Sequence, residues 1–599
     1  MSYRTHTCGQ LRESNVGQTV TLAGWVNSYR DHGGVRFIDL RDREGTTQVV
    51  FHPEAGAAHE LASKMRLEDV VQVTGTCIAR EGGINKRFPP GTIEIKAVSS
   101  EILADAQTPP FTPDDAHKVG EETRLRYRYI DMRNAKLQNA LKVRHRVAKL
   151  MRDHYDAHGF YEIETPFLCR STPEGARDFL VPSRLQAGSF YALPQSPQLF
   201  KQICMVGGLD KYFQIARCFR DEDPRADRQA EFTQVDMEMS FVTQEDVMRV
   251  NEEIIRKTWK EILGIEVPPV PRMTYEDAMN NYGSDRPDLR FDIKLVDVGD
   301  LAAKTDFKVF RGTLDAAGSI KAICIPQGGV KLSRKDTDAL TETAKQFGAG
   351  GLPLAKVEGG KLASGISKFI ESIQGDLIAR LGATDGDLIL FGVDARKTIV
   401  HKVLGELRCR IAAQMGLIPE GQWKWLWVTD FPAFEWDVET KRFYATHHPF
   451  TSPKPEDLHK LDSSDHGVIE SIKSNAYDLV LNGSELGGGS IRIHRSDVQS
   501  KIFRLLGITP EEAKMKFGFL LEALSFGAPP HGGMAFGLDR VVMHLVGTTN
   551  IRDVIPFPKT QNGADLMTEA PSPVEDSQLK DLHVRLQLPV KEVKAAPVA

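Results

Sequence analysis

The chain has 599 residues, with 26% charged and 41% hydrophobic side chains and a formal net charge of −5. This length is too great for one hydrophobic core, and the composition is that of a soluble globular protein with several domains. No apolar run reaches the roughly 20 residues that span a bilayer, and the N-terminus lacks the apolar stretch of a signal peptide. The seven cysteines are scattered without a CxxC pair. This disfavours a zinc site or a disulfide framework and predicts a reducing compartment, the cytoplasm.

Residues 1–105 are expected to form an all-β domain with one helix. A helical stretch at 54–67 lies among five strand-like runs, which cover 19–30, 35–41, 46–51, 70–80 and 92–103. This order is typical of an OB-fold barrel, which commonly binds single-stranded nucleic acid by stacking bases on aromatic side chains. Phe37 lies in mid-strand, where it is either a stacking platform or a core aromatic residue. The polar candidates beside it are Arg30, Gln48 and Glu94.

A linker and a long helix are predicted next. The Pro- and Thr-rich stretch from Thr108 to Asp115 is typical of a linker, and a basic stretch at 124–152 is a candidate nucleic-acid surface despite the negative net charge. Apolar residues at three- and four-residue spacing predict a helix from about Asn134 to His158, with Gly159 as its C-cap.

Residues 171–202 contain a loop, a strand and the start of a helix. The polar positions that we single out there are Glu174, Ser196, Gln198 and Lys201. Each has an ordinary interpretation, because a loop acid or a helix lysine is usually solvated.

The stretch from Tyr212 to Phe241 contains two strand-like runs around a highly charged loop. In the second run the apolar residues Val235, Met237, Met239 and Phe241 alternate with the polar residues Gln234, Asp236, Glu238 and Ser240. A period of two means that one face packs and the other presents a polar row. The loop carries Arg220, Asp221 and Glu222, followed by Gln229. Such fixed charges suit a zwitterionic ligand that bears phosphate, whereas the ordinary interpretation is a solvated hairpin.

Residues 288–425 interrupt this pattern with mixed helices and strands. We expect helices at Lys368–Leu381 and Thr398–Met415, a strand at 387–392, and Gly-rich turns at 328–329 and 348–351. No catalytic constellation is evident in this region.

The segment 477–495 predicts a hairpin that carries two acids. Asn482-Gly483 is a strong turn signal, and pairing through it places Val480 opposite Glu485. Asp478 would then lie one diagonal away on the same face, at roughly 7 Å. Two carboxylates so placed can share a Mg²⁺ ion bound to phosphates. Arg492 would point to the same sheet surface.

A Gly-rich strand-to-helix junction at 528–547 is the last informative segment. Gly532, Gly533 and Gly537 would allow a ligand to approach the backbone closely, and Arg540 falls in the first helical turn. Together with His447 in THHPFTSP, these residues complete the candidate set.

Taken in order, these segments resemble the class II aminoacyl-tRNA synthetases. The helix and strand of 134–166 resemble motif 1, CFRDED…RADRQ.EFTQ.D resembles motif 2, and 528–547 resembles motif 3. The sequence of the segment that resembles motif 2, and that of residues 477–495, is similar to the bacterial aspartyl-tRNA synthetases. The resemblance covers about the whole chain. It implies a multidomain α+β protein with these parts: an OB-fold anticodon-binding domain (1–105), a hinge (106–133), an antiparallel-sheet catalytic domain in two parts (134–287 and 426–565), an α/β insertion domain (288–425) and a C-terminal extension (566–599).

The resemblance also implies a role for each candidate residue in ATP-dependent aspartylation. The aspartate-binding residues would be Glu174, Ser196, Gln198, Lys201, Arg220, Asp236, His447 and Arg492. The ATP-binding residues would be Arg220, Asp221, Glu222, Gln229, Glu485, Gly537, Leu538, Asp539 and Arg540, with Arg220 and Arg540 as the catalytic pair. Asp478 and Glu485 would hold Mg²⁺, and Arg30, Phe37, Gln48 and Glu94 would bind the anticodon. The family resemblance further implies a homodimer with ATP, L-aspartate and tRNA(Asp) as ligands.

Two positions of the barrel resemble the non-discriminating members of the family, which aspartylate both tRNA(Asp) and tRNA(Asn). His32 stands where strictly aspartate-specific enzymes resemble one another in having leucine, and Gly82 and Gly83 stand where those enzymes tend to carry lysine. Loss of a side chain that rejects the wrong anticodon base relaxes the specificity for tRNA. This interpretation implies tRNA(Asn) as a second substrate and functional coupling to a tRNA-dependent amidotransferase. The alternative is a strictly discriminating enzyme, in which His32 is a solvated turn residue.

Two further alternatives are an RNA-binding or regulatory protein on an inactive synthetase scaffold and a related enzyme. The related enzyme would be an asparaginyl- or lysyl-tRNA synthetase or an asparagine synthetase, and the last of these lacks the anticodon-binding barrel. The first alternative would lack the phosphate-binding arginines or the metal acids, and all of these are present. Asparagine in place of aspartate would leave one of the two cations, Lys201 or Arg492, without a partner charge.

Overall fold

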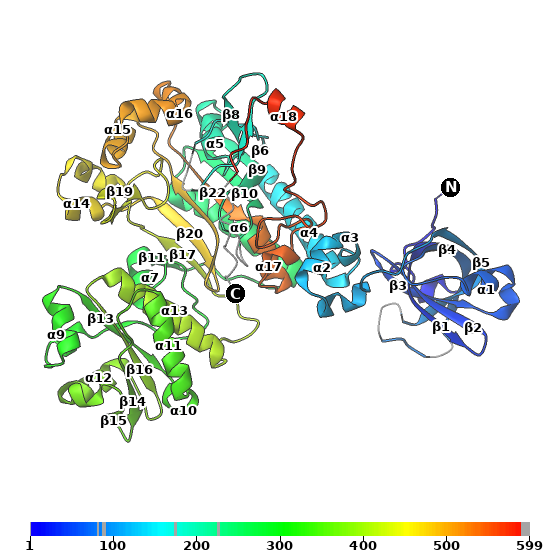
Figure 1. Ribbon diagram of the computed structural model, residues 1–599, viewed down its shortest axis with the longest axis horizontal. Helices are drawn as coiled ribbons and strands as arrows, with labels where there is room; N and C mark the ends of the chain where they lie inside the picture. The colour runs from blue at the N-terminus through cyan, green and yellow to red at the C-terminus, as the bar shows by residue number, and fades with distance from the viewer. Residues whose placement is uncertain (1, 81–82, 87–90, 173–175, 224–227, 589–599) are drawn as a thin grey trace, which may run out of the picture. The chain divides into compact units, whose positions relative to one another are not determined.

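The computed structural model describes residues 2–80, 83–86, 91–172, 176–223 and 228–588. The chain forms two compact units, which Figure 1 shows in the colours of the chain order. The first unit comprises residues 1–142 and 552–573, and the second comprises 143–551 and 574–599.

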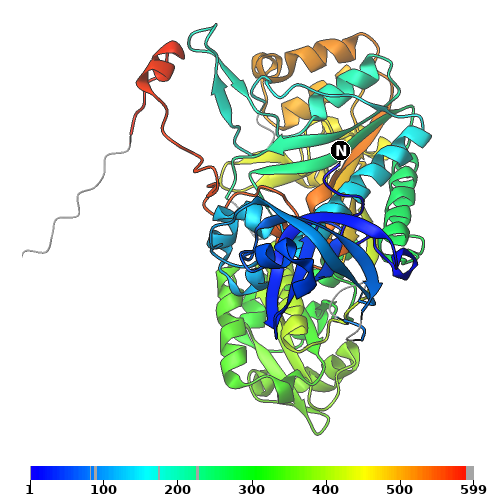
Figure 2. The same ribbon diagram turned by 90° about the vertical axis from the view of Figure 1, so that its right-hand side faces the viewer.

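The first unit contains a closed five-stranded barrel, drawn in blue in Figures 1 and 2. The strands follow one another around the barrel in the order β1 (Thr19–His32), β2 (Val35–Asp42), β3 (Gly45–Phe51), β5 (Ile93–Ala104) and β4 (Val70–Ala79). All neighbours are antiparallel except β3 and β5. The OB-fold prediction is therefore confirmed. The predicted helix over 54–67 is too long, because only α1 (Ala57–Ala62) is α-helical and Gly56, at a φ of 53°, separates it from a 3₁₀ turn.

The alternation of the barrel strands places Phe37 outside the hydrophobic core. The next residue, Ile38, and its cross-strand partner Val49 are fully buried in the core, whereas Phe37 is half-buried and lies directly opposite Arg30. Successive side chains of a strand point to opposite faces. The interpretation of Phe37 as a core aromatic residue is therefore wrong.

The first unit also contains α2 (Glu121–Arg126), α3 (Arg128–Asp131) and the start of α4 (Ala135–Ala157). The late segment 552–573 packs on these helices. The buried guanidinium of Arg128 donates to the carbonyl oxygens of Arg552, Ile555 and Pro556 at 2.8, 2.8 and 2.9 Å. Asp131 balances the buried charge at 2.6 Å from Arg128.

The second unit is built on an eight-stranded sheet. Its order is β11 (Arg272–Thr274), β17 (Trp425–Thr429), β20 (Ala476–Leu481), β21 (Ser484–Ile491), β22 (His531–Gly537), β10 (Glu231–Ser240), β9 (Lys211–Phe219) and β6 (Tyr161–Glu162). Only the two outermost pairs are parallel. The helices of this part are α5 (Gln198–Val206), α6 (Gln244–Leu263), α7 (Tyr275–Tyr282), α14 (His466–Glu470), α15 (Ser496–Leu505), α16 (Pro510–Ser525), α17 (Leu538–Val546) and α18 (Asp576–Asp581), and two small hairpins pair β7 (Leu180–Pro182) with β8 (Phe190–Ala192) and β18 (Phe434–Asp437) with β19 (Arg442–Ala445).

The polar and apolar faces of β10 are as predicted except at the last residue. Val235, Met237 and Met239 are buried among apolar neighbours. Phe241 is 73% exposed and has a φ of 56°. The strand ends at Ser240, and the Phe241 N–H donates to the Pro530 carbonyl as the chain turns away, so the expected packing of Phe241 is wrong.

A second, five-stranded sheet lies within residues 296–394. Its order is β12 (Val296–Asp297), β13 (Ser319–Ile325), β16 (Leu388–Asp394), β14 (Leu354–Glu358) and β15 (Lys361–Ala363), and its helices are α8 (Gly299–Ala302), α9 (Lys308–Asp315), α10 (Gly328–Lys331), α11 (Arg334–Gln346), α12 (Gln374–Leu381) and α13 (Lys397–Gln414). Alternate residues of β16 enter two separate cores, with Leu388 and Leu390 in one and Ile389 and Phe391 in the other. Both faces are therefore covered.

Two predictions for this sheet region are wrong in detail. The predicted helix over Lys368–Leu381 is α-helical only from Gln374, because Ile370 leaves helical geometry, with a φ of −124°, and is fully buried in the core. The expected turn at 328–329 is the start of the single-turn helix α10. Across the described residues, no helix is long and apolar enough to cross a membrane. All seven cysteines are free.

Candidate functional site

The polar face of the eight-stranded sheet carries a cavity of about 620 Å³. Most of the residues that the sequence singles out line it: Ser196, Gln198, Lys201, Arg220, Glu222, Gln229, Asp236, His447, Asp478, Glu485, Arg492, Gly537, Asp539 and Arg540. The strands that supply them are not consecutive in the chain, so the fold brings together segments more than 300 residues apart.

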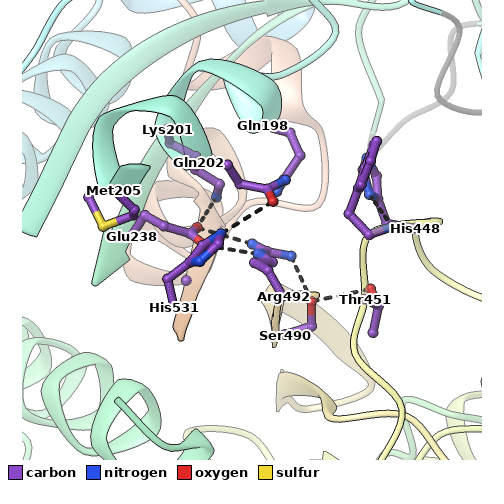
Figure 3. A network of polar contacts seen from close by, with 12 residues as sticks. Gln198, Lys201, Gln202, Met205, Glu238, His448, Thr451, Ser490, Arg492 and His531 are labelled. Atoms are coloured by element: carbon purple, nitrogen blue, oxygen red, sulfur yellow. Dashed lines mark hydrogen bonds and ion pairs between the residues drawn. The ribbon is translucent and has the colours of Figure 1, made fainter. Parts of the chain in front are cut away.

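Four buried charges form one network at the floor of the cavity. Lys201 on α5 lies 2.9 Å from Asp236 and 3.2 Å from Glu238, both on β10. Glu238 in turn accepts from Arg492 at 3.0 Å (Nε to Oε1) and 3.3 Å (Nη2 to Oε2). Figure 3 shows Glu238 between the two cations. All four side chains are nearly inaccessible to solvent, and two cations balance two carboxylates, which is what makes such burial tolerable.

The guanidinium of Arg492 is held at all three of its nitrogen atoms. Glu238 binds the edge formed by Nε and Nη2, and Nη1 donates to Ser490 Oγ at 2.7 Å, which is itself 3.2 Å from Thr451 Oγ1. A guanidinium has five N–H donors, and three are used here. Two donors, one on each Nη nitrogen, have no partner among the described residues and could bind an anionic ligand in the cavity.

Asp236 and Gln198 present buried polar atoms that have no partner among the described residues. These atoms are Asp236 Oδ1 and Gln198 Nε2. Burial raises the pKa of Asp236 to about 6, against the opposing charge of Lys201. Burial also raises the pKa of Glu238, but Arg492 and Lys201 outweigh burial and the net pKa is lowered. An unpaired carboxylate oxygen in such a site suits a cationic group of a ligand.

Residues that do not line the cavity support the buried charges at its floor. His531 Nδ1 donates to the Pro529 carbonyl at 2.8 Å, and its Nε2 lies 3.3 Å from the side-chain oxygen of the fully buried Gln202. Gly533 has no room for a side chain, because a Cβ there would lie 2.0 Å from Glu238 Oε2. Gly532 likewise faces Ile491. The expectation that these two glycines admit a ligand is therefore wrong, since they admit protein side chains; Gly537 does line the cavity.

The hairpin of β20 and β21 brings Asp478 and Glu485 together, but in a different register from the predicted one. Val480 pairs with Glu485 as expected, and a bulge then shifts Asp478 from Gly487 to Gly488. The two carboxylates converge over Gly488: a Cβ there would lie 2.2 Å from Asp478 Oδ1 and 3.5 Å from Glu485 Oε1. The pKa of Glu485 is raised, first by the charge of Asp478 and then by burial. Two hard oxygen donors held against each other fit a Mg²⁺ ion.

His447 lies at the edge of this acidic pair. Its Nε2 is 3.8 Å from Asp478 Oδ2, and its ring packs edge-on against Phe431. Burial acts to lower the pKa of His447, but Asp478 and Glu485 outweigh burial and the net pKa is raised.

Arg220 and Arg540 supply positive charge on either side of the cavity. Arg220 follows β9 and lies over the ring of Phe232 at 5.2 Å, and its buried Nε has no partner in the described part of the chain. Arg540, in the first turn of α17, donates to the Glu485 carbonyl. Glu222 is paired with Arg228 at 3.3 Å.

Two predicted residues that the structure describes, Asp221 and Leu538, do not line this cavity. Asp221 is 3.7 Å from Arg177, and Leu538 is buried. Glu174 lies outside the described residues. The Asp539 carboxylate lines the cavity but is bonded to Arg144 and to the Thr233 N–H.

Sequence reasoning missed Glu238 and Asp285 as site residues. Glu238 belongs to the polar row of β10, but nothing in the sequence distinguishes it from an acidic side chain that is exposed to solvent. Asp285 follows α7 in an irregular segment, where no periodicity could reveal it.

The candidates on the barrel form a row across its outer face. Arg30 donates to Asp39 at 2.8 Å and lies 3.4 Å from Gln48, which donates to Glu94 at 2.7 Å. The exposed ring of His32 contacts the Phe37 ring edge-on, with centroids 5.9 Å apart. Gly83 is exposed with a φ of 78°, and Gly82 lies outside the described residues.

Comparison with known families fits both parts of this architecture. Residues 120–561 match the family described as tRNA synthetases class II (D, K and N), and residues 20–103 match the OB-fold nucleic acid binding domain. The chain therefore belongs to the class II tRNA synthetases.

Relatives match the chain over nearly its whole length. An aspartate–tRNA ligase of Macrococcus caseolyticus is 51% identical over 592 residues, which are 98% of this chain and 99% of the relative. An aspartate–tRNA(Asp/Asn) ligase of Bacillus subtilis is 52% identical over 593 residues, with the same shares. The crystal structure of the asparaginyl-tRNA synthetase of Pyrococcus horikoshii with asparaginyl-adenylate has the same fold, with a TM-score of 0.57 at 18% identity over 93% of this chain and 98% of that chain.

Proposed function

We propose that the chain is an aspartate–tRNA ligase, which activates L-aspartate with ATP and transfers it to the 3′ end of tRNA. The observation that carries this proposal is the way Glu238 holds one edge of Arg492 and leaves two of its N–H donors and Lys201 beside the cavity. These two donors would bind the side-chain carboxylate of aspartate. Asp236 Oδ1 and the side-chain oxygen of Gln198, with Ser196 and Glu174, would accept hydrogen bonds from the substrate ammonium group.

Selection against asparagine follows from charge. The floor is neutral without substrate, and aspartate adds one side-chain carboxylate and, through its ammonium group near Asp236, one cation. The side-chain carboxamide of asparagine has one oxygen acceptor and one NH₂ donor, so its NH₂ group would face the N–H donors of Arg492. A site built to bond one polar group rejects an analogue that leaves buried groups unpaired.

The chain's own residues would carry both transfers by position and charge. The α-carboxylate of aspartate would attack the α-phosphate of ATP, break its bond to the β-phosphate and give aspartyl-adenylate and pyrophosphate. Arg220 would bind both reacting groups, and Arg540 would bind the γ-phosphate. Glu222 and Gln229 would contact ATP, and His447 would contact the substrate. Mg²⁺, held by Asp478 and Glu485, would neutralise charge on the phosphates. The tRNA 3′-hydroxyl would then attack the aspartyl carbonyl of the adenylate and release AMP, and no obligatory side-chain acid or base is needed.

The test is ATP–pyrophosphate exchange with a panel of amino acids. Exchange should depend on aspartate, with asparagine, glutamate and lysine at least a hundredfold less effective in kcat/KM. Equal exchange with asparagine would contradict the proposed role of Arg492 and Lys201.

Lowering the pH from 7 to 5 should raise the KM for aspartate with a midpoint near 6. Protonation of Asp236, whose folded pKa is about 6, removes the charge that attracts the substrate ammonium group. The effect of this protonation on stability has the opposite sign. A carboxyl group whose pKa is raised in the folded state makes the folded protein more stable as the pH falls. The higher KM would therefore reflect weaker binding of aspartate and not unfolding. KM measured at saturating ATP and Mg²⁺ tests this. An unchanged KM down to pH 5 would contradict it, and Asp236→Asn should show a weak but pH-independent affinity.

The barrel would bind the anticodon. Phe37 would stack on a base, and Arg30, Gln48 and Glu94 would read base edges. Phe37→Ala should raise the KM for tRNA about tenfold, because a stacked base is worth about 1–3 kcal/mol. Pyrophosphate exchange should stay unchanged. Val98→Ala, which trims an exposed apolar residue elsewhere on the barrel, is the matched control. Equal damage to exchange in Phe37→Ala would show a folding defect instead.

We infer further that both tRNA(Asp) and tRNA(Asn) are substrates, which the names of several relatives support. His32→Leu should lower kcat/KM for tRNA(Asn) about tenfold relative to tRNA(Asp), the loss of roughly one hydrogen bond. Gly83→Lys is a poor probe, since a φ of 78° strains any side chain there. Charging of both transcripts by wild type and His32→Leu is the measurement. A wild-type preference for tRNA(Asp) of a thousandfold or more would establish the strictly discriminating alternative.

We also propose that the enzyme is cytoplasmic and that it forms a homodimer. If tRNA(Asn) is aspartylated, its product needs a tRNA-dependent amidotransferase before use in translation.

A further inference from the structure

Two histidines and a glutamate cluster where the proposed function uses none of them. His154 and His158 lie at or just after the end of α4, four residues apart, and Glu253 lies on the facing helix α6. One ring nitrogen of each histidine and one carboxylate oxygen of Glu253 all lie within 4.8 Å of one another. Residues four apart share a helix face, which explains how α4 presents both rings to α6.

The backbone fixes the proton on each ring. His154 Nε2 lies 3.0 Å from the Val250 carbonyl, and His158 Nδ1 lies 2.8 Å from the His154 carbonyl. A carbonyl oxygen only accepts, so each of these nitrogens carries hydrogen when the ring is neutral. The other nitrogen of each ring then has a lone pair. Histidine ligands of metals commonly show this arrangement, with the second N–H donated to a carbonyl.

Charged groups surround His158 and Glu253. His158 Nε2 is 3.1 Å from Glu253 Oε2, which is an ion pair if the ring is protonated. A lone pair on His158 Nε2 would repel the Glu253 carboxylate at this distance unless a proton or a metal ion lay between the two atoms. Arg249 lies 3.5 Å from the other Glu253 oxygen, and the Lys211 ammonium donates to the His158 carbonyl. Burial lowers the pKa of His154 to about 4, so that ring is neutral.

The cluster is reachable from solvent. His154 is buried, the His158 side chain is 31% exposed and the Glu253 side chain is 44% exposed. An ion could enter on the Glu253 side and reach the buried nitrogen last.

We propose that His154, His158 and Glu253 form a binding site for a divalent transition-metal ion of the Zn²⁺ type, which would cross-link α4 and α6. Two imidazoles and one carboxylate, with water as the fourth ligand, are a ligand set that Zn²⁺ accepts, whereas Mg²⁺ prefers oxygen ligands alone. The ring nitrogens and carboxylate need to approach by a few tenths of an ångström to about 1 Å, because ligands of Zn²⁺ lie about 2.0–2.2 Å from the ion. The ion would take the place of the direct contact of 3.1 Å between His158 Nε2 and Glu253 Oε2.

The test is two separate titrations of the full-length protein, one with Zn²⁺ measured by calorimetry and one with Co²⁺ measured by its visible absorption. Millimolar Mg²⁺ is present throughout to occupy Asp478 and Glu485. We expect a high-affinity equivalent of Zn²⁺, weakened at least tenfold by His158→Ala and by Glu253→Gln. Both residues are partly exposed, so these variants should fold. His145→Ala, which removes an exposed histidine of the same helix, should bind as wild type does.

Two results would overturn the site. One is a wild-type protein that binds no Zn²⁺ under these conditions. The other is a set of variants in which His158→Ala and Glu253→Gln bind Zn²⁺ as tightly as wild type, or in which His145→Ala loses as much affinity as they do.

Discussion

Arg492→Leu should lower aspartate-dependent pyrophosphate exchange by about a thousandfold or more. The substitution removes the two donors that we assign to the substrate carboxylate and leaves an apolar side chain beside Glu238. Charge-assisted bidentate bonds of this kind are among the strongest polar contacts in proteins. Exchange at near wild-type rate and KM would contradict the assignment.

The same substitution should also weaken the fold, because Glu238 is fully buried and keeps only Lys201 as a partner. Breaking a buried ion pair costs about 3–5 kcal/mol. Arg492→Leu combined with Glu238→Gln removes both charges and should recover most of this stability without recovering exchange. That double variant separates a binding defect from unfolding. Arg495→Leu, which removes an exposed arginine paired with Asp497, is the matched control and should leave exchange unchanged.

Gly488→Ala should reduce exchange by about a hundredfold and raise the Mg²⁺ concentration that is needed for half-maximal rate. A Cβ at this position would lie 2.2 Å from Asp478 Oδ1, so the carboxylate must turn away from Glu485. The residue has no positive φ, so alanine itself is tolerated by the backbone. The measurement is the Mg²⁺ dependence of exchange at fixed ATP.

Gly518→Ala is the control for the glycine substitution. Gly518 lies in α16, and a Cβ there makes only ordinary contact with Lys514. Alanine in a helix is favoured over glycine, so this variant should be as active as wild type and slightly more stable. A Mg²⁺ dependence that is the same in Gly488→Ala and Gly518→Ala would show that Asp478 and Glu485 do not hold the ion.

Local periodicity predicted the elements that carry most of the cavity residues. The alternation in β10 placed Asp236 on a polar face, and the Asn482-Gly483 turn predicted the hairpin that carries Glu485. The OB-fold followed from strand order, since five short runs with one intervening helix leave few other topologies. In each case the signal lies within a few residues, where side-chain pattern and turn chemistry decide the structure.

The remaining features depend on contacts that are distant in sequence. The bulge that moves Asp478 opposite Gly488 arises where β21 packs between β20 and β22, and no period within 477–495 encodes it. Gly533 is small because Glu238, nearly 300 residues earlier, occupies the space beside it. Glu238 itself looks like any strand carboxylate until Lys201 and Arg492 are seen on either side. Ile370 breaks a helical pattern because a core from several strands and helices takes its side chain.

The most direct measurement is aminoacylation of purified tRNA(Asp) by the full-length protein with aspartate, asparagine, glutamate and lysine, each labelled and tested alone. We expect ATP- and Mg²⁺-dependent formation of aspartyl-tRNA, and we expect kcat/KM for each of the other three amino acids to be at least a hundredfold lower. Charging with asparagine or lysine in preference to aspartate, or failure to charge any tRNA with aspartate, would contradict it.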